Sequence, residues 1–323
     1  MRAGTTMLLA AAALAVLLVA GSFFLSAETL SPANPSWDGI SSLGLGARPL
    51  YDFSELQPGS GGTLVIVGPS VNYTAGEAGL VSGFMLRGGR VVVMDDYGTA
   101  NSLLRAMGSP VEIGRVPLCQ DMDYYRRPAL PVIEDIVDGG VTAGVRSLAL
   151  NHPVALATSG DARALARTSG LGWLDPDDDG RIDGNETFGA YPVIAHYSYG
   201  NGELVVAGDA DLLINGMLDR GDNGVLLSNI LAGEPVYLDV AHGQRLPPLA
   251  GLYYTVKYNI GAQIICALAI VGAGCAFAAR ARLLKGRGKD ESTQEADSRR
   301  PLLATMRKLP LSKREIEELD KKL

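Results

Sequence analysis

The chain has 323 residues, of which 47% are hydrophobic and 6% aromatic, a composition that allows one or two domains and argues against disorder. Residues 28–257 hold 14 basic and 27 acidic side chains, a balance of 14 − 27 = −13. This acidic middle argues against nucleic acid as a partner, because neutralising phosphates needs a basic face. The 3 cysteines offer neither a disulfide framework nor a CxxC metal site.

The first 27 residues are predicted to be a membrane anchor. Residues 7–26 form an uncharged run of 20 residues, which is about the length of a membrane-spanning helix. A signal peptide cleaved after Ser26 is the alternative. Apolar regions of signal peptides span only about 7 to 15 residues, so an uncleaved anchor is favoured.

A second membrane span is predicted at 259–279. Three tyrosines precede it, at positions 253, 254 and 258, as in an interfacial aromatic belt, and five basic residues follow it within 280–289. The positive-inside rule places this basic tail, 280–323, in the cytoplasm together with the N-terminus. We therefore expect a cell-membrane protein with two spans and its main domain outside. Two helices packed together in a soluble protein are the alternative.

Between the spans, the pattern predicts an α/β domain at 63–235, after a linker at 28–62 that is rich in Ser, Pro and Gly. The apolar runs 63–67 and 90–94 are typical of parallel strands, and each is followed by a predicted helix, at 74–87 and at 100–107. Thr74 and Glu77 have the spacing of a capping box. A doubly wound, mostly parallel sheet of the amidotransferase or flavodoxin-like type is expected.

The second half of the domain is less regular. Prolines are expected to break 111–136 into short pieces, which precede strands at 147–150 and 154–158 and a short helix at 161–167. Residues 191–199 and 203–207 alternate around Gly200-Asn201-Gly202, which predicts a β-hairpin. Helices are expected at 212–218 and 224–231. A stalk at 236–258, which contains His242, is expected to lead back to the membrane.

Residues 175–186, DPDDDGRIDGNE, match the ligand register of an EF-hand calcium loop. The expected ligands are Asp175, Asp177, Asp179, the Arg181 carbonyl, Asp183 and Glu186. Gly180 permits the sharp turn, and oxygen ligands in this number suit Ca²⁺ better than Mg²⁺. The glycines around the loop exclude the helices of an EF-hand. We predict an inserted, structural calcium loop in preference to a solvated acidic loop.

Polar residues follow the predicted strands, at the edge where open α/β sheets bind ligands. The candidates for such a crevice are Ser70, Asp95, Asp96, Thr99, Asn101, Asp209, Asp211 and Asn215. The alternative, which we favour, is that Asp96 or Thr99 and Asp209 or Asp211 cap the helices that follow them. The acidic cluster and the absence of a P-loop argue against phosphate binding.

An amidotransferase-type active site is not expected. Such enzymes need a cysteine on a strand-to-helix elbow with a histidine base. Cys119 lies in an irregular segment and is expected to be an idle thiol, and His152 is assigned to local structure. His196 falls in the middle of a strand. We therefore predict no catalytic residue of this kind.

Three segments resemble the family of uncharacterised membrane proteins known as domain of unknown function 4350. They are residues 88–104, 173–186 and 199–223. The resemblance covers about 63–233 and implies a degenerate class I glutamine-amidotransferase-like ectodomain between membrane spans. It further implies a membrane complex, since genes of this family often lie beside those of a MoxR-type AAA ATPase and of von Willebrand A-like proteins.

The function expected from these features is that of a non-catalytic, calcium-stabilised binding or scaffold subunit of a membrane complex. The alternative is a cell-surface hydrolase that uses the strand-end carboxylates. Two sequons, at Asn72 and Asn185, suit an external domain. Residues 311–323 form an amphipathic pattern that predicts either a solvated helix or a docking helix for a cytoplasmic partner.

Overall fold

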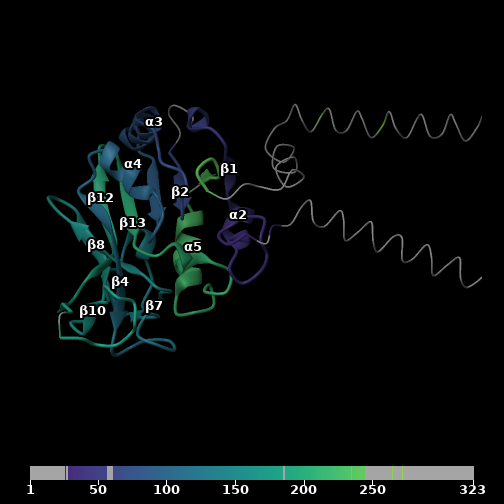
Figure 1. The fold of residues 1–323 in the computed structure, drawn as a ribbon. Coiled ribbons are helices and arrows are strands. Elements are labelled where there is room, and N and C mark those ends of the chain that lie inside the picture. The colour runs from purple at the N-terminus through teal and green to yellow at the C-terminus, as the bar shows by residue number, and fades with distance from the viewer. Residues whose placement is uncertain are drawn as a thin grey trace, which may run out of the picture. The chain divides into compact units, whose positions relative to one another are not determined.

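The computed structural model describes residues 26, 28–56, 61–184, 186–233, 235–243, 264 and 271. The chain divides into two units, Met1–Tyr258 and Asn259–Leu323, and the fold below belongs to the first. Figure 1 shows this unit as a twisted sheet with helices packed against it and a smaller β-structure that carries β10.

Eight strands form the main sheet, in the order β1-β14-β2-β3-β13-β12-β9-β6. In that order they span Arg48–Leu50, Val236–Asp239, Thr63–Val67, Arg90–Met94, Gly202–Ala207, Pro192–Tyr199, Arg163–Arg167 and Asp135–Ile136. The first five strands pair in parallel, and the last three add antiparallel strands beyond β13. The prediction of a mixed α/β fold with a mostly parallel sheet is therefore confirmed.

The central strands explain the apolar runs in the sequence. Every residue of β2 is buried, and so is β3 after Arg90. Strands that are covered on both faces cannot alternate apolar with polar residues. Val65 and Val92 pack into one apolar cluster with Ile230, whereas Leu64 belongs to a second cluster on the other face.

Helices cover both faces of this sheet. The four are α2 (Ser41–Gly46), α3 (Ala75–Leu86), α4 (Ala100–Ala106) and α5 (Asn223–Leu231), with short 3₁₀ turns η1 (Phe53–Glu55), η2 (Gly140–Thr142) and η3 (Ala210–Leu213). The cluster of α2 and α5 lies on one face, and that of α3 and α4 lies on the other. The capping box of Thr74 and Glu77 is confirmed at the start of α3.

Two smaller sheets complete the domain. Strands β11 (Phe188–Gly189), β10 (Gly172–Leu174), β4 (Val111–Gln120) and β8 (Val154–Thr158) form the first, in that order, and β5 (Val132–Ile133) pairs with β7 (Leu148–Ala149) in the second. The prediction that prolines break 111–136 into short pieces is confirmed after Gln120, where turns and the short strands β5 and β6 follow, but it is wrong at Pro117. Strand β4 runs through Pro117 because a register shift between Ile113 and Pro117 removes the need for a regular ladder there.

Two predicted helices are not α-helices. Residues 161–167 were expected to be helical, but β9 occupies this segment because it pairs with both β12 and β6. Residues 212–218 leave the 3₁₀ turn η3 after Leu213. The backbone N–H groups of Asn215 and Gly216 donate to Gly39 and Trp37 instead of to a helix ladder. In both segments, hydrogen bonds to distant parts of the chain determine the backbone conformation.

The sheet extends into both segments that the sequence assigns to a linker and a stalk. Strand β1 lies within 28–62 and β14 within 236–258, and these two strands pair with each other. Strand β14 also pairs with β2, so it lies inside the sheet. Phe53, which also lies within 28–62, is buried.

In the described part of the chain, no helix has the length and apolarity that a membrane crossing requires. Apart from positions 26, 264 and 271, the expected spans at 7–26 and 260–279 lie outside the described residues. The same holds for the expected C-terminal helix at 311–323.

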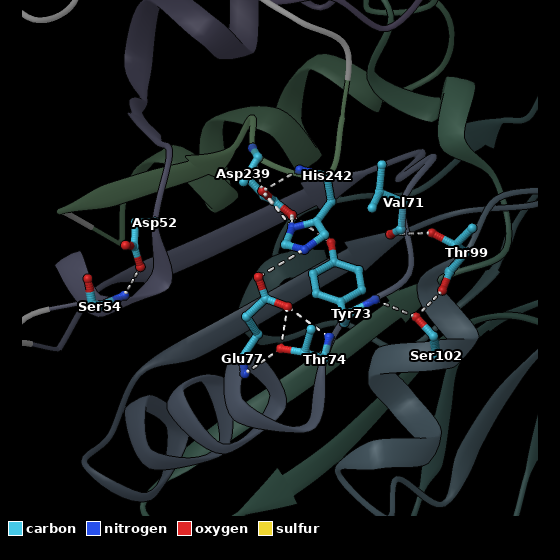
Figure 2. Close-up of polar contacts among 11 residues, drawn as sticks. Asp52, Ser54, Val71, Tyr73, Thr74, Glu77, Thr99, Ser102, Asp239 and His242 are labelled. Atoms are coloured by element: carbon cyan, nitrogen blue, oxygen red, sulfur yellow. Dashed lines mark hydrogen bonds and ion pairs between the residues drawn. The ribbon is translucent and has the colours of Figure 1, made fainter.

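His242 fastens the end of β14 to α3, and this placement replaces the expected position in a stalk. Its ring is buried, with Nε2 3.3 Å from Glu77 Oε1 and Nδ1 3.1 Å from Asp239 Oδ2 (Figure 2). Tyr73 stacks on the ring at 3.9 Å and donates its hydroxyl to Asp239 at 2.6 Å. Burial opposes charge on the ring, but hydrogen bonds and charges of Asp239 and Glu77 outweigh it and raise the pKa of His242.

The raised pKa predicts a pH-dependent stability. Because the folded pKa exceeds the unfolded value of about 6.5, the contribution of His242 is complete below pH ~6.5 and falls as the pH rises through the folded pKa. His242→Gln should therefore cost about 1.5–3 kcal/mol of unfolding free energy at pH 5.5 and less at pH 9. Urea unfolding at both pH values measures this, with His152→Asn as the control. An equal cost at both pH values would contradict it.

Candidate functional site

The predicted calcium loop connects two antiparallel strands. Residues 175–186 lie between β10 and β11, which pair through Trp173 and Phe188. Strand β10 also pairs with β4, and Trp173 is buried. Among the described residues, the loop is therefore flanked by strands and not by the helices of an EF-hand, as the surrounding glycines indicated.

The acidic side chains of the loop converge. Carboxylate oxygens of Asp175, Asp177 and Glu186 lie within 4.8 Å of one another, and so do those of Asp177, Asp179 and Asp183. The two groups share Asp177, so all five predicted carboxylate ligands belong to one cluster. Asp175, Asp177 and Glu186 could hold a metal ion. Arg181, whose carbonyl is the sixth predicted ligand, lies exposed in the same loop.

Asp175 organises the turn. Its carboxylate accepts backbone hydrogen bonds from Gly180 at 2.8 Å and from Asp179 at 3.3 Å. Gly180 has φ +70°, a conformation that favours glycine. Cys119 Sγ lies 3.8 Å from Asp175 Oδ2, and burial, followed by the Asp175 charge, raises the pKa of this thiol to about 12. Cys119 is therefore a buried, protonated thiol that supports the loop.

One oxygen of this cluster lacks a partner. Glu186 Oε2 accepts the backbone N–H of Asp183 at 2.9 Å, but Glu186 Oε1 is buried with no hydrogen-bond partner. A buried acceptor without a donor costs about 1–3 kcal/mol. The ionised form of Asp177 is also disfavoured, because a hydrogen bond to Asp175, followed by burial and the charges of neighbouring aspartates, raises its pKa. A cation would satisfy both groups, so the donor set fits a hard metal ion.

At the carboxyl ends of β3 and β13, two buried aspartates accept backbone hydrogen bonds. Asp95 Oδ1 accepts from Asp96 at 3.0 Å and Gly98 at 2.9 Å, and Oδ2 accepts from Ala100 at 2.9 Å. Asp95, and not the expected Asp96 or Thr99, thus bonds the first turn of α4. Burial raises the pKa of Asp95 to about 6, although these N–H groups favour the ionised form.

Asp209 has the same role one strand further along. Its two oxygens accept backbone N–H groups of Asp211 at 2.8 Å and of Asn151 at 2.7 Å. It caps η3 as predicted. Asp211 in turn accepts the side chain of Asn151 at 2.7 Å. Burial raises the pKa of Asp209 and that of Asp211, the latter to about 6, and the nearby charge of Asp96 raises both further.

The other crevice candidates are engaged in structural hydrogen bonds. Ser70 Oγ donates to the carbonyl of His242 at 3.3 Å, and Thr99 Oγ1 donates to that of Val71 at 2.7 Å. Asn101 exchanges two hydrogen bonds with the backbone of Ile113. Asn215 binds the segment before α2 and the start of α2. It donates to the carbonyls of residues 34 and 36 and accepts from the backbone N–H of residue 42.

The structure brings the acidic loop 175–186 next to this strand-end edge, which the sequence pattern did not indicate. The charges of Asp96 and Asp178 both act on Tyr97 and on His152. His152 bonds Asn151 at 2.9 Å and approaches Arg127 at 2.7 Å, and its φ is +55°. It therefore serves local structure, as predicted. His196 pairs with Glu203 on the neighbouring strand.

Comparison with known proteins identifies a family. A family model described as "Domain of unknown function (DUF4350)" matches residues 32–231. No curated protein matches the chain.

Solved structures share parts of the fold at low similarity. The mmIFT52 N-terminal domain is 20% identical, with a TM-score of 0.40, over 51% of this chain and 73% of that chain. A β-galactosidase from Bacillus circulans sp. alkalophilus is 16% identical, with a TM-score of 0.34, over 53% of this chain but only 22% of that chain. A cytoplasmic protein from Salmonella typhimurium LT2 is 12% identical, with a TM-score of 0.36, over 60% of this chain and 78% of that chain. These values carry no functional conclusion.

The family match, in contrast, spans more than half of the chain. It includes every strand of the main sheet except β14, as well as the acidic loop and the strand-end aspartates. The chain therefore belongs to the DUF4350 family.

Proposed function

We propose that this DUF4350 chain is a non-catalytic, calcium-stabilised binding subunit of a membrane complex. The observation that carries the proposal is the engagement of the strand-end polar groups. Asp95 accepts three backbone N–H groups, and Asp209 accepts one on each oxygen. A carboxylate with this many fixed donors is suited to hold backbone in place and not to shuttle protons. The edge that binds ligands in related architectures is used here for structure.

Calcium is the ion that fits the loop best. The cluster offers five carboxylates, and the buried, unpartnered Glu186 Oε1 supports a cation at its centre. A site with this many oxygen ligands suits Ca²⁺ better than Mg²⁺, which keeps several of its waters. We assign the ion a structural role, because the loop joins β10 to β11 and so fixes the small sheet beside the strand-end edge.

The membrane setting is part of the proposal. The uncharged run at 7–26 and the apolar run at 260–279 support two spans with both termini in the cytoplasm and the domain outside. The amidotransferase-like ancestry of the domain and partners of the MoxR-type AAA ATPase and von Willebrand A-like classes rest on the family resemblance.

A cell-surface hydrolase is the second candidate, and one observation favours it. Burial, followed by the charge of Asp96, raises the pKa of Asp211 to about 6, as for a general acid beside a carboxylate. Among the described residues, the carboxylate of Asp211 accepts one hydrogen bond, from Asn151, and so it is less occupied than that of Asp95 or Asp209.

Calcium should stabilise the purified full-length chain. For a dissociation constant of about 10⁻⁴ M, typical of extracellular sites, 10 mM Ca²⁺ should add about 2.7 kcal/mol. The double variant Asp177→Asn/Glu186→Gln should lose this gain, whereas Asp161→Asn, an exposed aspartate outside the loop, should keep it. Thermal melting with and without Ca²⁺ measures the effect. Equal shifts for wild type and the double variant would remove the metal assignment.

Substitution of Asp211 separates the two functions. Asp211→Asn keeps the acceptor for Asn151 and removes one charge, so its stability should change by less than about 0.5 kcal/mol. A binding subunit carrying it should still complement a deletion strain. Asp209→Ala should instead cost about 1–3 kcal/mol, since two backbone donors lose their acceptor. A stable Asp211→Asn protein that fails to complement would favour the hydrolase.

Topology is tested by labelling intact cells. A membrane-impermeant thiol reagent should modify a cysteine placed at the exposed position Ser54 but not one placed at Ser292. Permeabilised cells, in which both should react, are the control. Labelling of the Ser292→Cys chain in intact cells would reverse the orientation and remove the calcium-rich surroundings of the loop.

A further inference from the structure

A groove of about 210 Å³ opens on the face of the sheet that α5 covers. Its floor includes Ile214 and Met217, which belong to the apolar cluster on that face. Its rim carries aromatic and cationic side chains. We call it the Tyr125 groove and define it by Trp37, Tyr125, Arg126, Leu130, Met217 and Arg220.

Two guanidinium groups stack on one aromatic ring at this groove. The Cζ atom of Arg220 lies 4.3 Å from the centroid of Tyr125, and that of Arg126 lies 5.2 Å away. A cation–π contact does not consume the N–H donors of a guanidinium, which can still bind a planar anion. Arg127, next to Arg126 in the chain, contacts His152. In the part of the chain that the structure describes, none of these three arginines lies within 4 Å of a carboxylate oxygen.

The charge of the groove is opposite to that of its surroundings. Residues 28–257 carry a net charge of −13, from 14 basic and 27 acidic side chains. Three arginines in one place on such a domain attract an anionic partner that the rest of its surface repels. Trp37, on the rim, is 68% exposed. Trp, Tyr and Arg are also the residue types that most often dominate binding energy at protein interfaces.

We infer that the Tyr125 groove binds an acidic peptide segment of a partner protein. An apolar side chain of the segment enters the groove, and carboxylates on either side of it bind the free edges of Arg126 and Arg220. The volume of about 210 Å³ suits one large side chain, and a concave site of this kind fits a protruding residue better than a flat lipid surface. The inference rests on the proposed role as a binding subunit and names the chemistry of its partner.

The test is fluorescence anisotropy with the purified full-length chain and a labelled nonapeptide, in which a central tryptophan is flanked on each side by four aspartates or glutamates. Saturable binding that weakens with added salt is expected. Arg126→Gln/Arg220→Gln should weaken it at least tenfold, and Trp37→Ala at least fivefold. Arg87→Gln is the control for the loss of an arginine charge away from the groove. It removes one such charge from an exposed position after α3, the helix on the other face of the sheet, and should bind as wild type does.

Two further peptides test the two parts of the inference. Replacing the central tryptophan by alanine should weaken binding at least fivefold, and replacing the acids by Asn and Gln should abolish it. Equal affinity of the wild type and the double arginine variant would overturn the inference. The inference would also be overturned if the peptide did not bind while these arginines were needed for binding to phosphatidylglycerol vesicles or for dimer formation.

The outcome is separable from that of the proposed function. If the peptide does not bind the groove but the Asp211→Asn variant still complements, the protein remains a binding subunit that docks its partner through another face. Peptide binding together with a failing Asp211→Asn variant would overturn the non-catalytic role alone.

Discussion

Two buried carboxylates determine the shape of the carboxyl edge of the main sheet. Burial opposes the ionised form of Asp95 and Asp209, and backbone N–H groups offset that cost at the ends of β3 and β13. The turn that satisfies Asp95 leaves no room for a side chain at position 98, where a Cβ would lie 2.4 Å from Asp95 Oδ1 and 2.5 Å from the carbonyl of Pro69. The start of α4, the path into η3 and the position of Asn151 all follow from these two acceptors.

The sequence predicted the elements whose signals are local. The apolar runs of β2 and β3, the capping box at Thr74 and the hairpin of β12 and β13 are each determined by a few neighbouring residues, and each is present. The convergence of the acidic loop was also predicted, because an EF-type register specifies its own ligands within twelve residues. Such patterns can be interpreted without the rest of the chain.

The elements that were missed depend on distant partners. Strand β14 has the unremarkable sequence VYLD and becomes a central strand only because it lies between β1 and β2. Strand β9, RALAR, consists of helix-forming residues, yet two neighbouring strands pair with it. The contact of His242 also depends on a distant partner. Glu77 comes from α3, and no sequence pattern near His242 predicts that the two side chains meet. Parallel pairing joins segments that are far apart in sequence, so local patterns do not report it.

The use of hydrogen-bonding groups distinguishes the carboxyl edge of the sheet from the proposed binding face. The hydrogen bonds that make the edge around Asp95 and Asp209 rigid also occupy the oxygens that chemistry would need. The guanidinium groups of Arg126 and Arg220 show the reverse arrangement: both lie over the ring of Tyr125, and neither pairs with a carboxylate of the described residues. Asn151 lines the Tyr125 groove and also bonds Asp209 and Asp211, so the rigid edge lies directly behind the groove. A groove on such a support loses little conformational entropy when the proposed peptide binds.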